Sequence, residues 1–195
     1  MYANVTIAEL WRPRAKVMAR FYDAALIVSG SLLLALSAQL AIGFPVPISA
    51  QTFAVLLIGA LLGPKRGAIC VLAYLVEGAM GLPVFAQGKA GLVVFLGPTG
   101  GYLVGFIAAA YIVGLLAKKG WDRRFLTTFL AMLIGSSAIY LFGVGWLSCL
   151  VGAKQALIAG LYPFVVGDIL KALLAAMLLP AGWKLLERFD LPGAD

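Results

Sequence analysis

The chain has 195 residues, of which 63% are hydrophobic, and its mean hydropathy is +1.03. A soluble domain is typically about 45–50% apolar, so this composition excludes an ordinary soluble domain and predicts that lipid surrounds much of the chain. The sequence contains no histidine, which removes the commonest general base and a frequent metal ligand. We therefore expect no metal site and no cofactor.

Six apolar stretches, taken in chain order, predict an all-α integral membrane protein with six transmembrane helices. They cover residues 22–42, 50–62, 68–80, 99–117, 125–146 and 163–186. No hydrophilic segment between them is long enough to fold separately, so residues 1–195 are expected to form a single transmembrane domain. Within it we expect a cytoplasmic segment, a six-helix bundle and a cytoplasmic tail, at residues 1–21, 22–186 and 187–195.

The second and third stretches are short. Each has roughly 13 residues, whereas a perpendicular helix needs about 20 residues to cross a bilayer. Either these helices extend into the flanking loops, or their irregular ends are buried inside the bundle. The second arrangement is tolerated only where protein or a water-filled cavity satisfies the backbone. Short segments interrupted by glycine or proline therefore point to a binding site.

Basic residues are distributed unevenly between the two predicted sides of the membrane. One side holds twelve of the 15 Lys and Arg residues, namely Arg12, Arg14, Lys16, Arg20, Lys65, Arg66, Lys118, Lys119, Arg123, Arg124, Lys184 and Arg188. The other side holds only Lys89 and Lys154. The positive-inside rule then places both termini in the cytoplasm of a multi-pass inner (plasma) membrane protein. The net charge of +7 thus reflects topology and contact with membrane lipid, and it does not indicate nucleic acid.

The remaining lysine, Lys171, lies inside the last apolar stretch and follows Asp168 by three residues, which places both side chains on one helix face. Ionisable residues within a membrane span are costly and usually face a polar cavity. One interpretation is an ion pair that only locks the bundle together. The other is a solute site, in which Lys171 binds a carboxylate and Asp168 accepts hydrogen bonds from N–H groups.

Two further segments are predicted to lie near the outer face. Gln51 and Thr52 follow a proline-rich stretch and are candidates for the mouth of a site, although loop polarity explains them equally well. The glycine-rich connection between the third and fourth stretches is typical of a lid that closes over a ligand. Its glycines do not form a Walker pattern for ATP phosphates.

Small residues are spaced four apart in the first stretch, as Ser31 with Ala35 and Ser37 with Ala41. This spacing allows helices to approach closely. It is explained by packing within the bundle or by docking onto another membrane subunit, and both interpretations stay open.

Four motifs occur in a fixed order along the chain, at residues 45–52 (PVPISAQT), 78–86 (GAMGLPVFA), 97–105 (GPTGGYLVG) and 163–171 (PFVVGDILK). With them the sequence resembles the BioY family, the biotin-specific S components of energy-coupling factor (ECF) transporters, over essentially the whole chain. The resemblance implies an S-component-like bundle of six helices, with a ligand cavity near the outer face under the lid. It implies that Asp168 and Lys171 bind the ligand and that Gln51 and Thr52 lie at the mouth. It further implies pocket-wall or lid positions at Glu77, Gly78, Phe85, Gln87, Gly91, Thr99 and Tyr102.

Biotin also suits the residues themselves, because its carboxylate needs a cation, its ureido N–H groups need an acceptor and its bicycle needs apolar contact. We expect a non-catalytic subunit for biotin uptake. By the resemblance, a transmembrane coupling subunit and ATPase subunits of an ECF module supply the energy. A solitary ion-coupled carrier, with Asp168 and Lys171 as its relay, is the alternative. A membrane enzyme fits poorly with the absence of histidine.

Overall fold

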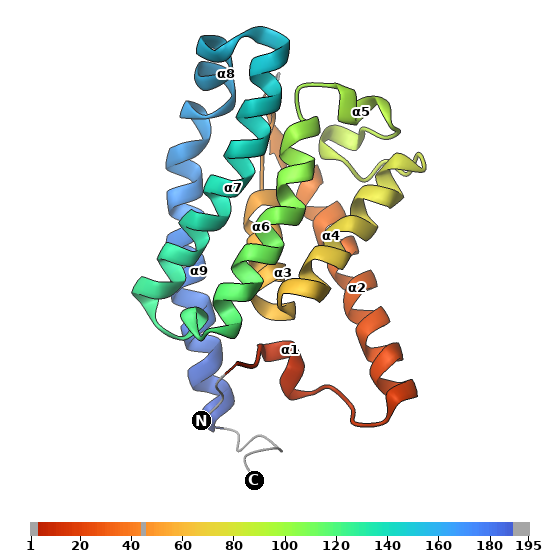
Figure 1. Cartoon of the computed structure of the whole chain (residues 1–195), viewed down its shortest axis with the longest axis vertical. Coiled ribbons are helices and arrows are strands. Elements are labelled where there is room, and N and C mark those ends of the chain that lie inside the picture. Colours follow the sequence, from red (N-terminus) through yellow and green to blue (C-terminus); the bar gives the residue numbers. More distant parts are fainter. Residues whose placement is uncertain (1–3, 44–45, 189–195) are drawn as a thin grey trace.

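The computed structural model describes residues 4–43 and 46–188, which form a bundle of helices with one short sheet (Figure 1). The predicted break at Pro45 and the tail from residue 189 onward lie outside the described residues. The longer helices are α2 (Lys16–Gln39), α3 (Gln51–Leu62), α4 (Pro64–Ala79), α6 (Gly100–Lys118), α7 (Phe125–Val151) and α9 (Tyr162–Arg188). The shorter elements are α1 (Ile7–Leu10), β1 (Ala41–Ile42), β2 (Ile48–Ser49), η1 (Ala86–Gly88), α5 (Val93–Leu96), η2 (Trp121–Arg123) and α8 (Ala153–Gly160).

The prediction of six transmembrane helices is wrong. Among the described residues, four helices are long and apolar enough to cross a membrane, namely α2, α6, α7 and α9. Helices α3 and α4 have only 12 and 16 residues. At about 1.5 Å per residue they reach roughly 18 and 24 Å, less than the hydrocarbon core of about 30 Å.

Backbone chemistry explains why α3 and α4 stay short. Gly63 has φ 83° and Pro64 begins α4, so the two helices meet at a sharp turn. At the other end of α4, Gly81 has φ 101°, which an ordinary residue would adopt only with strain. Most residues of α3 are buried inside the bundle, whereas α4 exposes Ile69, Leu72 and Val76 on one face, each 49% exposed. Hydropathy does not distinguish such short helices from a full crossing.

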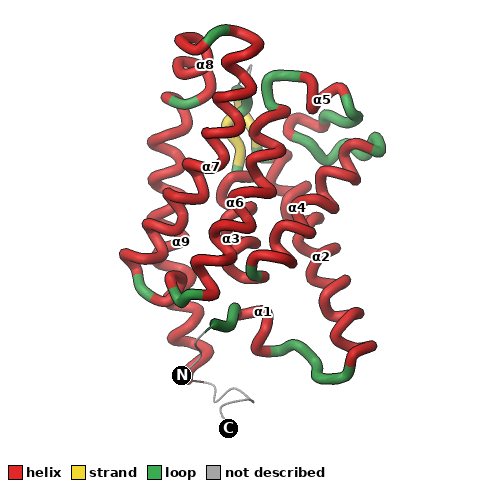
Figure 2. The backbone as a smooth tube through the Cα atoms, viewed as in Figure 1, coloured by secondary structure: helices red, strands yellow, loops and turns green. Residues whose placement is uncertain are grey.

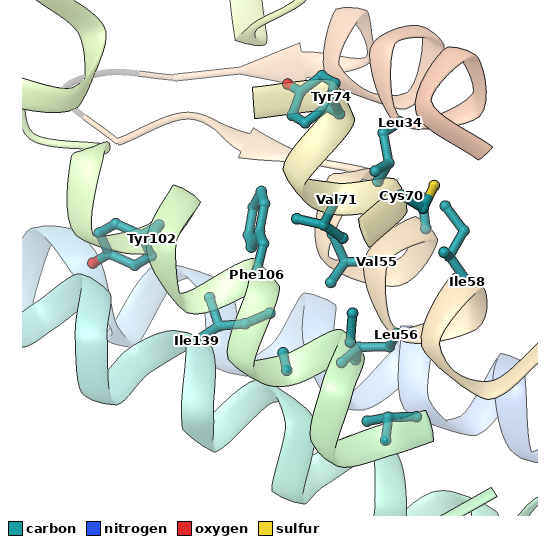
Figure 3. Close-up of a cluster of buried hydrophobic side chains, with 14 of the residues drawn as sticks. Leu34, Val55, Leu56, Ile58, Cys70, Val71, Tyr74, Tyr102, Phe106 and Ile139 are labelled. Carbon is teal, nitrogen blue, oxygen red and sulfur yellow. The ribbon is translucent and has the colours of Figure 1, made fainter. Parts of the chain in front are cut away.

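Helix α6 lies at the centre of the bundle and packs against α7, α3 and α4. Glycines permit this closeness: a Cβ added at Gly59 would lie 2.5 Å from the carbonyl oxygen of Ala110 on α6. Figure 3 shows the apolar core that results, with Val55, Val71 and Phe106 among its members. This core fixes the positions of the helix ends that surround the candidate site.

The two ends of the bundle differ in structure (Figure 2). At one end the described chain both begins and finishes, and α1 lies across the α3–α4 turn, with Glu9 paired to Lys118 at 2.9 Å. The opposite end carries strands β1 and β2, which pair antiparallel with Ile42 opposite Ile48, and the long connection between α4 and α6. We call residues 80–99 the lid segment.

Large apolar side chains cover the outside of the bundle. Leu36 on α2, Leu141 on α7 and Val166 on α9 are each more than two-thirds exposed. Such surfaces are stable when lipid surrounds them. The chain is therefore an all-helical, multi-pass membrane protein apart from its short hairpin.

Candidate solute-binding site

A cavity lies beneath the lid segment, at the end of the bundle opposite α1. Its volume is about 50 Å³, which holds only a few water molecules. The lining residues come from the β-hairpin, α3, the lid segment, α6, α7 and α9, and they are Val46, Pro47, Ser49, Gln51, Thr52, Phe85, Ala86, Lys89, Val94, Thr99, Tyr102, Leu103, Phe106, Ile139, Tyr140 and Phe164. Pockets for small organic solutes are typically about 300–1,000 Å³, so such a solute fits only after lining side chains move.

A polar network forms one wall of this cavity. Lys171 Nζ donates hydrogen bonds to the backbone oxygen of Ser49 (2.8 Å), to Thr52 Oγ1 (2.8 Å) and to Asp168 Oδ1 (3.0 Å). The hydroxyl of Thr52 donates to Asp168 Oδ1 (3.0 Å), and the hydroxyl of Tyr140 donates to Asp168 Oδ2. The network therefore joins β2, α3, α7 and α9 at one point.

The acid and the lysine lie behind the cavity wall. Asp168 is only 5% exposed, and among the described residues the cavity lining includes Thr52 and Tyr140 but neither Asp168 nor Lys171. All three N–H donors of the Lys171 ammonium have partners. The structure thus brings the predicted pair to the site, and its groups meet the cavity through Thr52 and Tyr140.

Gln51 connects the hairpin to the lid segment. Its Nε2 donates to the hydroxyl of Tyr74 at 2.7 Å, and that hydroxyl donates to the backbone oxygen of Val84 at 3.1 Å. Ser49 Oγ donates to Gln51 Oε1 at 3.2 Å. Gln51 is buried and lines the cavity, and its two hydrogen bonds within the protein use half of the capacity of its amide.

The lid segment is held down by aromatic packing. Phe85 is 2% exposed and makes edge-on contacts with the rings of Tyr74 and Phe95, at centroid distances of 5.5 and 5.6 Å. A Cβ added at Gly78 would lie 2.1 Å from Phe85 Cζ, so glycine is needed where the ring sits. The backbone N–H of Gly91 donates to the oxygen of Gly78 at 2.7 Å and closes the segment.

The other predicted lid and wall residues divide into two groups. Thr99 and Tyr102 line the cavity, and Tyr102 also donates from its hydroxyl to the Gly160 backbone oxygen at 2.8 Å. Gln87 lies outside the lining and ties the lid segment to the hairpin, because its Nε2 donates to the Gly43 oxygen at 3.0 Å. Glu77 also lies outside the lining and accepts a hydrogen bond from Ser31 on α2.

Of the four small residues that were predicted as a docking face, three lie on α2 and Ala41 lies on β1, and only the two serines are buried. Ser31 is fully buried, and Ser37 is buried and donates to the Leu34 backbone oxygen at 2.7 Å. Ala35 and Ala41 are half-buried. Packing within the chain accounts for both serines, and docking at the two alanines stays a prediction.

Several apolar lining residues and two polar ones, Tyr140 and Lys89, were not singled out by sequence reasoning. The sequence around Tyr140 does not indicate a binding role, because a single tyrosine in an apolar helix is equally consistent with simple packing. Lys89 did give a signal, as one of two basic residues on the sparsely charged side. Its exposed side chain lines the cavity mouth, and within residues 4–43 and 46–188 it has no hydrogen-bond or ion-pair partner.

Fold and site together define a class: multi-pass helical membrane proteins that hold a small solute in a polar and aromatic cavity near one face. Comparison with known proteins identifies the member of this class. A model of the BioY family matches residues 12–188, and the chain belongs to that family. The resemblance predicted from the four motifs is thereby confirmed.

Relatives and a solved structure agree with this assignment. The chain is 43% identical over 135 residues to the biotin transporter BioY of Thermotoga maritima, and this match covers 69% of this chain and 79% of that protein. It is 39% identical over 164 residues to the biotin transporter BioY of Rhizobium etli, and this match covers 80% of this chain and 86% of that protein. A crystal structure of the S component for biotin from an ECF-type ABC transporter superposes with a TM-score of 0.77 at 28% identity, covering 88% of this chain and 95% of that one. The S-component fold is therefore correct, although the span count predicted for it was not.

Proposed function

We propose that this chain binds biotin in the cavity beneath the lid segment and mediates its uptake as the specificity subunit of an ECF-type transporter. The observation that carries the proposal is the Thr52–Asp168–Lys171–Tyr140 network beside an aromatic-lined cavity, in a chain of the BioY family. The names of the similar proteins support the same solute.

The polar wall suits the ureido ring of biotin. Thr52 and Tyr140 line the cavity, and donation from their hydroxyls to the Asp168 carboxylate makes the hydroxyl oxygens better acceptors for ureido N–H groups. Lys171 balances the charge of Asp168, because an unpaired buried carboxylate would be costly. Phe85, Phe106 and Phe164 supply apolar contact for the bicycle.

The carboxylate of biotin requires a separate cation. Lys171 is fully engaged within the network, so it has no donor left unless the network rearranges. Lys89 lies at the cavity mouth with an exposed ammonium. In this proposal Lys89 binds the carboxylate, and the ureido ring enters first.

Entry of biotin requires movement of the lid segment, because the closed cavity is far smaller than a typical ligand pocket. Phe85 is the principal obstacle, since its ring fills the space beneath the segment. Binding and lid movement are thus coupled, and Gly81, Gly88 and Gly91 within the segment, which have positive φ, supply its hinges.

The energy for transport comes, in this proposal, from a transmembrane coupling subunit and ATPase subunits, because the sequence contains no Walker pattern. The end of the bundle that carries α1 is placed in the cytoplasm by the positive-inside rule. The lid segment and cavity then face outward, where an imported solute arrives.

Uptake of labelled biotin tests the proposal. A host without its own biotin transporter would express the chain alone, and again with the coupling and ATPase subunits. We expect biotin accumulation that requires hydrolysis-competent ATPases and survives a protonophore. Uptake by the chain alone that an uncoupler abolishes would instead establish a solitary ion-coupled carrier.

A further inference from the structure

A second cavity lies at the opposite end of the bundle, between α1, the first turns of α2 and the start of α4. It is open on one side, with a volume of about 500 Å³. Its lining residues are strongly basic, and they are Glu9, Arg12, Pro13, Arg14, Lys16, Ala19, Arg20 and Arg66. Nothing in the proposed biotin site involves them.

The acidic groups in and beside this cavity are already neutralised. Arg12 forms a two-pronged pair with Asp23, with N–O distances of 3.2 and 2.8 Å, and Arg66 approaches the same carboxylate at 2.8 Å. Glu9 is paired with Lys118 at 2.9 Å. Burial raises the pKa of Glu9, but the hydrogen bond from Lys118 and the nearby cations outweigh it and hold the pKa below its ordinary value. Among the described residues, neither Asp23 nor Glu9 is left to balance further cations at this cavity.

Three cations on this cavity have no such balance. Arg14, Lys16 and Arg20 are exposed, and within the described part of the chain none of their side chains has a hydrogen-bond or ion-pair partner. Three positive charges that converge on one open cavity attract an anion, and the geometry suits a group with several acceptor oxygens such as a phosphate.

The surroundings of the cavity indicate a lipid phosphate. Val17, Met18 and Phe21 lie among the basic residues on the first turns of α2 and are 66%, 64% and 73% exposed. Their helix continues into the lipid-facing surface at Leu32 and Leu36, which are 57% and 69% exposed. A cationic cavity at the edge of an apolar membrane face matches a molecule with an anionic head and acyl chains.

We propose that this cavity binds the headgroup of an anionic phospholipid. Arg14, Lys16 and Arg20 contact the phosphate, and the acyl chains lie along Val17, Met18 and Phe21. The site fixes the depth of α1 and the start of α2 at the membrane surface. It is independent of the biotin assignment, since the two cavities share no residue.

Native mass spectrometry of the purified full chain tests the proposal. The chain would be titrated in mixed micelles with phosphatidylglycerol or phosphatidylcholine, as wild type and as the triple variant Arg14→Gln/Lys16→Gln/Arg20→Gln. The matched control is Lys65→Gln/Lys119→Gln/Arg124→Gln, which removes the same charge from exposed positions at the same end but outside the cavity. Melting temperature and biotin binding report whether each variant is folded.

The proposal predicts that wild type prefers phosphatidylglycerol, that the site variant loses at least about tenfold in affinity for it, and that the control stays within about twofold. The single variant Arg20→Gln perturbs the fold less than the triple variant, and its affinity for phosphatidylglycerol is expected to fall about threefold. Equal losses in both triple variants would show bulk charge attraction and overturn the site. Unchanged lipid affinity in the site variant would also overturn it, whether the cavity is unoccupied or serves an acidic protein segment. Displacement of the lipid by glycerol phosphate at equal concentration would identify a free phosphate site and contradict the lipid assignment.

Discussion

The hydroxyl of Tyr140 on α7 donates a hydrogen bond to the carboxylate of Asp168 on α9, and of these two residues only Tyr140 lines the cavity. Asp168 therefore acts on a bound solute through its neighbours. Two contributions of the Asp168–Lys171 pair can therefore be measured separately. One is its contribution to the stability of the bundle, and the other is its contribution to ligand binding.

Removing the charge pair in two steps distinguishes these effects. Asp168→Asn leaves the Lys171 ammonium without its anion, and we expect the free energy of unfolding to fall by roughly 3 kcal/mol. The double change Asp168→Leu/Lys171→Met removes both charges and is expected to recover most of that loss. Biotin binding should stay at least about tenfold weaker in both variants.

Thermal unfolding in detergent and equilibrium biotin binding check this prediction together. If the double variant regained both stability and affinity, the pair would serve only to lock the bundle, and the solute-site interpretation of Asp168 would be contradicted.

Lys89 is predicted to bind the carboxylate of biotin. Lys89→Gln should weaken biotin binding by roughly tenfold but leave the affinity for biotin methyl ester unchanged, because the ester has no charge to pair. Lys154→Gln, which changes the other basic residue assigned to that side, is the control and should leave both affinities unchanged. Equal losses for biotin and its ester would place the carboxylate elsewhere.

Gly78 is predicted to hold the lid segment closed by making room for Phe85. Gly78→Ala should displace the ring, lower the free energy of unfolding by about 1–3 kcal/mol and weaken biotin binding. Adding Phe85→Leu should restore part of the stability, because the smaller side chain relieves the clash. Gly145→Ala is the matched control, since a Cβ there meets no atom within 4 Å. Independent, additive effects of the two substitutions would show that they are not coupled.

The raised pKa of Asp122, at the α1 end of the bundle, predicts that the stability of the protein depends on pH. Burial raises the pKa of Asp122 to about 6, although a hydrogen bond from Trp183 Nε1 (2.6 Å) opposes the shift. A raised folded-state pKa means that stability is greatest below the ordinary value of 3.8 and is lost as pH rises through about 6. The whole loss is about 3 kcal/mol, of which about 1 kcal/mol falls between pH 5 and pH 7.

Melting curves across that pH range should show this loss for wild type and a flatter profile for Asp122→Asn. Glu9 does not imitate the effect, because its lowered pKa makes stability fall in the opposite direction, as pH decreases. A wild-type profile as flat as that of Asp122→Asn would contradict the prediction.

The sequence predicted where the main helices lie, but the prediction that α3 and α4 cross the membrane was wrong. The predicted runs matched α3, α6 and α9 to within two residues at each end, although Pro180 lies inside α9. The runs that became α3 and α4 look equally apolar. Their lengths are set by Gly63, Pro64 and Gly81, and hydropathy does not register whether an apolar helix faces lipid or protein.

The candidate site shows the same division between local and tertiary information. The spacing of Asp168 and Lys171 predicted a pair on one face, because that relationship is local to α9. The contribution of Tyr140 arises from the packing of α7 against α9, and no feature near position 140 encodes it. Glu77 was placed near the ligand by its position before the lid segment, but the rotation of α4 directs it to Ser31.

The most direct test of the account is equilibrium binding of biotin to the purified chain, as wild type and as Thr52→Val. Thr52 lines the cavity, and valine keeps the shape of its side chain but removes the hydroxyl that bonds both Asp168 and Lys171. The account predicts saturable one-to-one binding by wild type and an affinity at least about tenfold lower for the variant. Wild type without saturable binding, or a variant that binds as tightly as wild type, would contradict it.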